Sequence, residues 1–152
     1  MLRFLLVLIL TVAIDLYSKF IVMNKMVLGQ SIPLWTNVFH LTYIHNPGAA
    51  FGMLAGKTWF FVTITTLVLL GLLLSYRWIA KAGLLYQVAL GLVAGGALGN
   101  LRDRIVYSKV IDFLDFRIWP IFNLADTAIC IGVGLILLDA LRDLKKGKGD
   151  MA

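Results

Sequence analysis

The chain has 152 residues, of which 61% are apolar and 14% charged, and its mean hydropathy is +0.91. Soluble domains are closer to half apolar and a quarter charged, so most apolar side chains here must face lipid. The composition excludes an ordinary cytosolic enzyme and a disordered chain. The net charge of +6 is typical of basic residues that flank membrane spans, because no aromatic residues interleave with them as in a nucleic-acid-binding stripe.

Four apolar stretches each approach the roughly 20 residues that a spanning helix needs. They predict membrane-spanning helices over about residues 4–23, 59–79, 84–101 and 122–141. The first stretch has no small-residue cleavage site after it and is interpreted as a retained helix rather than a secretory signal peptide. The prediction is an all-α membrane protein, a four-transmembrane-helix bundle that forms a single integral membrane domain over residues 1–152.

Basic residues indicate the orientation of this bundle, since cytoplasmic loops carry an excess of Lys and Arg. An even number of spans puts both termini on the same side of the membrane. The C-terminal tail and the short loop after the second span are basic, with Arg142, Lys145, Lys146, Lys148, Arg77 and Lys81. Both termini are therefore predicted to be cytoplasmic, in a multi-pass protein.

The segment over about residues 25–57 is too polar and broken to span. Within it, residues 38–45 are rich in β-branched and aromatic residues, and Asn46-Pro47-Gly48 ends the run with turn chemistry. These patterns predict a small extracytoplasmic β segment. The small residues that follow, up to Gly52, fit either a tight loop re-entering the membrane or a site where Asn46 projects and a ligand's backbone approaches.

Two charged residues lie within the first span. Asp15 and Lys19 are four residues apart, so they share one helical face and can pair. An unpaired charge in the bilayer costs about 3 kcal/mol or more, which makes pairing the minimal explanation. A purely structural ion pair and a pair that organises a polar site near the outer face both fit this spacing.

The third span ends in Gly95-Gly-Ala-Leu-Gly-Asn100-Leu-Arg-Asp-Arg104. Glycine and alanine permit close helix packing in lipid, but packing does not account for Asn100 and Arg104, which lie four apart on one face. Arg104 is a permanent cation with a donor fork suited to carboxylates or carbonyls. Arg102 and Asp103 point elsewhere and are interpreted as solvated or interfacial.

Three further aspartates, Asp112, Asp115 and Asp126, surround the start of the last span. One interpretation makes Asn123 the N-cap of that helix, with Asp126 at its third position and the other two aspartates in solvated loops. The other notes that Asp126 lies at the membrane boundary, where a carboxylate needs a partner or a proton. Two carboxyls in a low-dielectric site share one proton, the arrangement that activates water against a peptide carbonyl in aspartic proteases.

Other catalytic arrangements have less support in the sequence. Ser108 lacks a neighbouring base, and the single cysteine, Cys130, lies in an apolar run and is predicted to be a buried packing residue. One cysteine excludes an internal disulfide, and two histidines make a His-rich metal centre an unfavourable interpretation. An acid pair is thus the strongest chemistry in the chain.

Five motifs in sequence resemble those of the bacterial lipoprotein signal peptidase (signal peptidase II) family. The resemblance runs from about residue 15 to 132. Its motifs are Asp15-Leu-Tyr-Ser-Lys19, Asn46-Pro-Gly-Ala-Ala-Phe-Gly52, Gly95-Gly-Ala-Leu-Gly-Asn100-Leu-Arg-Asp-Arg104, Val110-Ile-Asp112-Phe-Leu-Asp-Phe116 and Phe122-Asn-Leu-Ala-Asp126. The resemblance implies an intramembrane aspartyl endopeptidase of the bacterial cytoplasmic membrane, with its active site near the outer face. Such enzymes remove the signal peptide from diacylglyceryl-modified prolipoproteins by cleaving just before the lipidated cysteine. They need no metal or organic cofactor.

The resemblance also implies roles for individual residues. Asp112 and Asp126 match the catalytic dyad, and the positions that line or support the site match Asp15, Lys19, Asn46, Gly48, Asn100, Arg104, Asn123 and Ala125. The implied partners are prolipoprotein substrates, membrane lipid and the peptide antibiotic globomycin, with no nucleic acid. Ser108 departs from the family pattern, in which glycine is common there, and the link from Arg117 to Pro120 is short.

A small proton-coupled transporter or channel is the principal alternative, since intramembrane Asp and Lys form proton relays. The polar residues cluster near one face of the predicted bundle, and no second cluster continues the path to the cytoplasmic side. A non-catalytic membrane scaffold, whose aspartates serve only as caps and ion pairs, is the other alternative.

Overall fold

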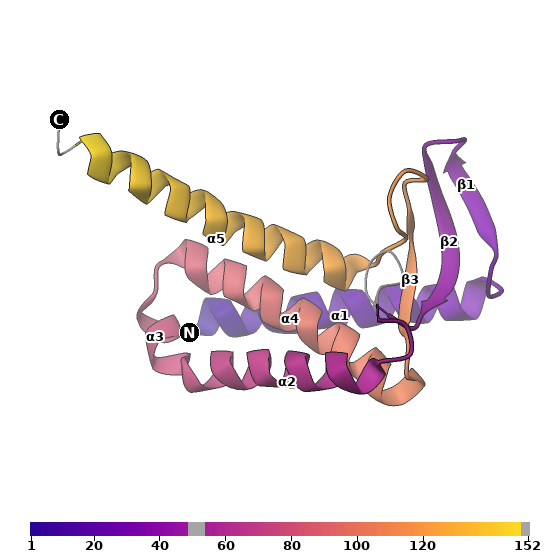
Figure 1. Cartoon of the computed structure of the whole chain (residues 1–152), viewed down its shortest axis with the longest axis horizontal. Helices are drawn as coiled ribbons and strands as arrows, with labels where there is room; N and C mark the ends of the chain where they lie inside the picture. The colour runs from indigo at the N-terminus through magenta and orange to yellow at the C-terminus, as the bar shows by residue number, and fades with distance from the viewer. Residues whose placement is uncertain (49–53, 150–152) are drawn as a thin grey trace.

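The computed structural model describes residues 1–48 and 54–149, with side chains up to Arg142. The elements in chain order are α1 (Leu2–Lys25), β1 (Ser31–Trp35), β2 (Phe39–Asn46), α2 (Thr58–Leu74), α3 (Tyr76–Lys81), α4 (Leu84–Tyr107), β3 (Val110–Asp115) and α5 (Leu124–Gly149). Figure 1 shows the long helices packed side by side, with a three-stranded sheet across one end of them. Part of the predicted β segment over residues 25–57, namely residues 49–53, lies outside the described residues.

Three helices among the described residues are long and apolar enough to cross a membrane: α1, α4 and the Leu124–Arg142 part of α5. α2 is equally apolar but has only 17 residues. The predicted span over residues 59–79 is divided at Ser75, where α2 ends and the short α3 begins. The apolar run stops there because Tyr76, Arg77 and Trp78 are residues that favour the membrane interface.

α4 is the central helix and packs against α1, α2 and α5. In its most apolar stretch 56% of the residues are buried, against 22% in α1 and 17% in α5. Glycine allows this close approach. A Cβ atom on Gly95 would lie 2.6 Å from Cβ of Thr11 on α1, and one on Gly96 would overlap the Ala125 carbonyl on α5. The prediction that this glycine-rich stretch packs helices together is confirmed.

The sheet has the order β1-β2-β3, and both strand pairs are antiparallel. β2 matches the strand predicted over residues 38–45 to within one residue. The interpretation of Asp112 and Asp115 as solvated loop acids is wrong, since both belong to β3, which pairs with β2. Ile111 and Phe113 of β3 pack with Tyr43 against Val22 of α1 and against Met26, which directly follows α1. The partners of β3 in pairing and packing lie more than 60 residues earlier in the chain. A strand that depends on such distant partners leaves no pattern in its own sequence.

Gly99 gives a test of how closely α1 and α4 approach. A Cβ atom there would overlap Asp15 Oδ2 and lie 3.0 Å from Asp15 Cγ, and the buried Asp15 carboxylate is held in place by Lys19 and by the Ala125 backbone N–H. Gly99→Ala is expected to lower the free energy of unfolding by about 2 kcal/mol, measured by thermal unfolding in detergent. Gly71→Ala in α2 is the matched control, because nothing lies within 4 Å of its added Cβ. Equal melting temperatures for the two variants would contradict this packing.

Candidate active site

A buried ion cluster joins α1 to α4 behind the site. Lys19 Nζ lies 2.8 Å from Asp15 Oδ2, 2.8 Å from Asp103 Oδ2 and 3.0 Å from Asn100 Oδ1. Each of the three ammonium protons therefore has one acceptor. The predicted Asp15–Lys19 pair is confirmed. The interpretation of Asp103 as solvated or interfacial is wrong, because its residue is 0% exposed and its carboxylate faces Lys19 across the helix interface.

The cluster also orients the Asn100 side chain. Asn100 Oδ1 accepts hydrogen bonds from Lys19 Nζ at 3.0 Å and Asn123 Nδ2 at 3.1 Å. With two donors on its oxygen, the amide group has its nitrogen on the other side, where Nδ2 donates to Asp126 Oδ1 at 2.8 Å. Charge pairing in the membrane interior thus fixes a donor that faces Asp126.

Two carboxyl groups from different elements come together around Asn123. Asn123 Nδ2 donates to Asp112 Oδ1 on β3 at 2.7 Å, and the Asn123 backbone N–H donates to Asp126 Oδ2 at 3.3 Å. In return, the Asp126 backbone N–H donates to Asn123 Oδ1 at 2.9 Å. This reciprocal pair is a capping box at the start of α5, which confirms the predicted N-cap. The same cap contacts both carboxyls, and Asp112, which the capping interpretation placed in a solvated loop, is buried.

β3 and the turns around it hold Asp112 in place. Asp112 is opposite Ile44 of β2, and Asn46 Nδ2 donates to its Oδ2 at 2.8 Å. At the end of α4, Ser108 adopts the left-handed conformation with φ 57°. That conformation favours glycine, the residue that the resemblance implies at this position. Ser108 nevertheless takes this conformation, so its departure from the family pattern leaves the turn into β3 intact.

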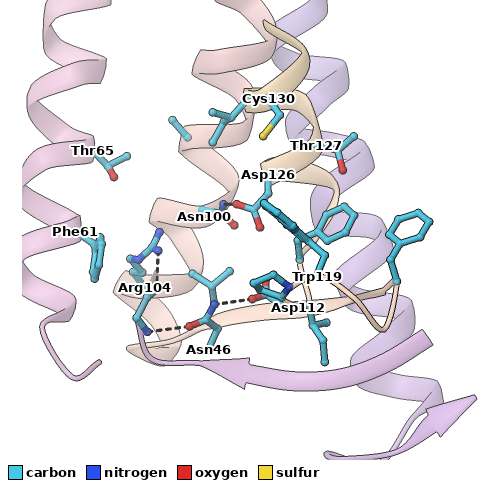
Figure 2. Close-up of a pocket in the computed structure, with 18 of the residues that line it drawn as sticks. Asn46, Phe61, Thr65, Asn100, Arg104, Asp112, Trp119, Asp126, Thr127 and Cys130 are labelled. Atoms are coloured by element: carbon cyan, nitrogen blue, oxygen red, sulfur yellow. Dashed lines mark hydrogen bonds between the residues drawn. The ribbon is translucent and has the colours of Figure 1, made fainter. Parts of the chain in front are cut away.

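Both carboxyls line a cavity of about 890 Å³, shown in Figure 2. Six of the ten predicted site residues line it: Asn46, Gly48, Asn100, Arg104, Asp112 and Asp126. The other four are buried behind the first six: Asp15, Lys19, Asn123 and Ala125. Among these, the Ala125 backbone N–H donates to Asp15 Oδ1 at 3.0 Å. The sequence motifs therefore meet at one end of the bundle.

Arg104 places a fixed positive charge in the same cavity. Its guanidinium carbon lies 4.9 Å from the centre of the Phe61 ring on α2, and its Nη2 donates to the Gly48 carbonyl at 3.4 Å. Figure 2 shows this side chain between α2 and the β2 strand, on the same side of α4 as Asn100. A cation there stabilises negative charge on the facing carboxyls.

Several lining residues had not been identified from sequence. α2 contributes Phe61 and Thr65, and α5 contributes Thr127 and Cys130. The prediction that Cys130 is a buried packing residue is wrong, because it is exposed and lines the cavity one helical turn after Asp126. The four-residue spacing from Asp126 is the signal that places it on this face.

Asp115 also differs from its interpretation as a solvated loop acid. It is 3% exposed and accepts hydrogen bonds from Thr42 and Arg117. The loop that follows it, Phe116 and residues 118–121, lines the cavity as well. These contacts depend on the turn after β3, which the local sequence pattern does not reveal.

The family model for signal peptidase (SPase) II matches residues 7–142. The chain belongs to the signal peptidase II family. The lipoprotein signal peptidase of Desulfitobacterium hafniense is 47% identical over 138 residues, which are 90% of this chain and 91% of that relative. The lipoprotein signal peptidase of Bacillus subtilis is 44% identical over 144 residues, covering 92% and 94% of the two chains.

Solved structures agree with this family membership. A bacterial membrane enzyme determined by the in meso method at 2.3 Å resolution superimposes with a TM-score of 0.88 at 37% identity, covering 94% of this chain and 90% of that one. A second such structure, at 1.9 Å, gives a TM-score of 0.83 at 38% identity, covering 92% and 93%. The three apolar helices and the antiparallel sheet are thus the fold of a membrane enzyme, and the signal peptidase II family is a family of proteases.

Burial of the two neighbouring acids changes the pKa of Asp112. Burial and the nearby charge of Asp126 raise the pKa of Asp112 to about 6, although hydrogen bonds from Asn46 and Asn123 oppose the rise. A proton that an exposed aspartate would release near pH 4 is therefore retained in the folded protein to about pH 6. A carboxyl that holds its proton into this range is able to donate a hydrogen bond to a carbonyl oxygen.

The raised pKa of Asp112 couples stability to pH. Because the folded protein keeps a proton that the unfolded chain releases above its ordinary pKa of 3.8, this stabilisation is present below about pH 4 and is lost as pH rises through about 6. Asp112→Asn is neutral at every pH and lacks this dependence. Relative to wild type, its free energy of unfolding should increase by on the order of 3 kcal/mol between about pH 4 and pH 7. Unfolding in detergent across this range measures it, and a constant difference would contradict the raised pKa.

Proposed function

We propose that this protein is an intramembrane aspartyl endopeptidase that removes the signal peptide from diacylglyceryl-modified prolipoproteins, cleaving just before the lipidated cysteine. The observation that carries the proposal is the meeting of Asp112 and Asp126 on Asn123 at the wall of an apolar cavity. In this proposal the two aspartates are the catalytic dyad. Family membership supports the substrate class, since the relatives are named lipoprotein signal peptidases.

The proposed reaction is direct attack of water on the peptide carbonyl. Asp126, which faces the cations Lys19 and Arg104, accepts a proton from water as the water oxygen bonds to the carbonyl carbon. Protonated Asp112 donates its proton to the carbonyl oxygen, and a tetrahedral diol forms. Collapse of the diol breaks the C–N bond, Asp126 passes its proton to the leaving amine, and Asp112 regains the proton of the second hydroxyl. The dyad ends as it began.

The supporting residues of the cavity have distinct proposed tasks. Asn46, Asn100 and Arg104 hold backbone carbonyls of the substrate, so that only one peptide bond meets the dyad. Lys19, Asp15, Asn123 and Ala125 keep these groups oriented, and Gly48 leaves room for the substrate backbone. The signal helix enters between α2 and α5, which both pack against α4 and flank the cavity in Figure 2. Membrane lipid surrounds the bound helix.

In this proposal the chain is a single integral membrane domain with four spans. α2 is the additional span, although its 17 residues are short. It contains no charged residue and none of its residues is buried, as a lipid-facing helix requires. Its start is beside the end of α4, where Thr58 Oγ1 donates to the Ser108 carbonyl at 2.9 Å, so the two helices run in opposite directions. The chain thus returns through α2 to the side where α4 begins.

This topology puts the sheet and the dyad at the outer face of the bacterial inner membrane and both termini in the cytoplasm. The basic residues near the opposite end, Arg77, Lys81 and Arg142, support the orientation. Toward that end, Phe4 and Val7 of α1 pack on Gly91 of α4, and beyond them the Met1 amino group donates to Gln87 Oε1 at 3.1 Å. The Phe4 and Val7 contacts interrupt the polar path that a proton-coupled transporter needs, so they favour a peptidase.

Removal of either proposed catalytic carboxyl should abolish cleavage in a folded protein. Asp112→Asn and Asp126→Asn are expected to lower the rate by at least about 10³-fold, because each loses an acid–base function. The measurement is a gel-shift assay in detergent with a diacylglyceryl-modified prolipoprotein. Asp139→Asn, about 20 Å further along α5, is the matched control and should cleave normally, and a globomycin-type antibiotic should block the wild type. Full activity in either dyad variant would refute the assignment.

The proposed topology is testable with single cysteines. In a Cys130→Ala background, Thr36→Cys between β1 and β2 and Lys81→Cys at the end of α3 both replace exposed residues. A membrane-impermeant thiol reagent added from outside should label Thr36→Cys only, since an odd number of crossings separates the two positions. Labelling of both would show that α2 does not span, and labelling of Lys81→Cys alone would reverse the orientation.

A further inference from the structure

The loop that joins β3 to α5, residues 116–121, is anchored firmly at both ends. At its base, Leu114 and Phe122 exchange backbone hydrogen bonds of 2.8 and 3.1 Å. The Phe116 ring stacks on the Phe122 ring with centroids 5.8 Å apart and planes 11° apart, and Phe39 of β2 packs on Phe116 at 4.8 Å. The loop therefore has a defined base on the sheet.

Asp115 braces the first turn of this loop. Its Oδ1 accepts the backbone N–H of Arg117 at 2.8 Å, and its Oδ2 accepts hydrogen bonds from Arg117 Nη1 at 3.0 Å and Thr42 Oγ1 at 2.7 Å. Arg117 is in the left-handed region, with φ 66°, a conformation that costs about 1–2 kcal/mol for a residue with a Cβ atom. Although burial acts to raise the pKa of Asp115, the hydrogen bonds from Thr42 and Arg117 hold it below its usual value. An ionised Asp115 thus offsets the strain of the turn.

The braced loop presents large apolar side chains to the cavity. Ile118 is 93% exposed and Trp119 is 60% exposed, and both line the cavity with Pro120 and Ile121. The folded chain does not bury these two side chains, so they contact solvent or lipid. Apolar side chains fixed in that state beside a cavity are typical of a binding surface.

One part of the cavity wall carries the polar groups, and the loop forms another part. The donors Asn46, Asn100 and Arg104 come from β2 and α4, and the dyad comes from β3 and α5 (Figure 2). The described loop residues from Ile118 to Ile121 add no charged or amide side chain. A peptide backbone needs hydrogen-bond partners when it is buried, so it belongs on the first part of the wall. Hydrocarbon needs none and belongs on the loop.

Resting on the proposed function, we propose that residues 116–121 form the subsite for the acyl chains of the lipidated cysteine. Ile118 and Trp119 contact the hydrocarbon, and Asp115 is a positioning residue that holds the loop in the shape that presents them. The dyad and the acyl subsite border one cavity, so a peptide bond is cleaved efficiently only when its neighbouring cysteine carries chains long enough to cover the loop.

Acyl-chain length tests the subsite directly. Ile118→Ser removes an exposed side chain and leaves folding intact. With a prolipoprotein carrying two long acyl chains, KM is expected to rise about tenfold with kcat unchanged, because the apolar contact is lost. With two short chains that do not reach the loop, wild type and variant should have equal KM values. Equal KM values on the long-chain substrate, or the same rise on both substrates, would overturn the proposal.

Variants of the brace test the positioning role. Asp115→Asn keeps an acceptor for the Arg117 backbone N–H but loses the ion pair, whereas Asp115→Ala loses both. The rise in KM on the long-chain substrate should be larger for Ala than for Asn, with kcat within about twofold of wild type. A fall in kcat at unchanged KM would overturn it. Arg117→Ala, which keeps the backbone hydrogen bond and the fold, should behave like Asp115→Asn.

Controls separate this inference from the proposed function. Wild type and Asp139→Asn are assayed on the same long-chain substrate. If folded wild type does not cleave it, the proposed function itself fails. If wild type cleaves and Ile118→Ser is indistinguishable from Asp139→Asn, the peptidase assignment stands and the acyl subsite is refuted.

Discussion

The buried ammonium group of Lys19 is the interaction on which the rest of the site depends. A charge in the membrane interior is tolerated only when it is fully paired, and here the acceptors are Asp15 on α1 with Asp103 and Asn100 on α4. Pairing fixes the register of the two helices, and Gly99 leaves the space in which the Asp15 carboxylate fits. The same pairing turns the Asn100 amide so that its nitrogen faces the carboxyl proposed as the base. The contacts that pair the Lys19 charge therefore also orient the polar groups of the site.

Asn123 joins local folding to the site in a similar way. Helix α5 needs a cap for its first backbone N–H groups, and Asn123 supplies it while its side-chain nitrogen holds Asp112 of β3. The side-chain amide of Asn123 thus contacts both the start of α5 and strand β3. This arrangement brings Asp112 and Asp126 together although they belong to different elements. One residue thus holds the two acids, through its side-chain nitrogen and its backbone N–H.

Sequence patterns predicted the parts of this structure that repeat along a helix. Apolar runs identified α1, α4 and α5, and four-residue spacing placed Asp15 with Lys19 and Asn100 with Arg104 on common faces. β3 was missed because a strand made by distant pairing has no local period. Asp103 was misjudged because its partner is on another helix, and the loop braced by Asp115 was not identified for the same reason. Local spacing shows which side chains share a face, whereas contacts between elements decide what that face meets.

In the proposed function, Asp112 and Asp126 act together on one peptide bond. The most direct test is a crystal structure of the protein with a non-cleavable analogue in which a hydroxyl-bearing carbon replaces the carbonyl before the lipidated cysteine, a mimic of the tetrahedral state. The hydroxyl is expected to lie between the two carboxyls, within hydrogen-bond distance of both. An analogue that binds tightly with its hydroxyl away from either aspartate would contradict it.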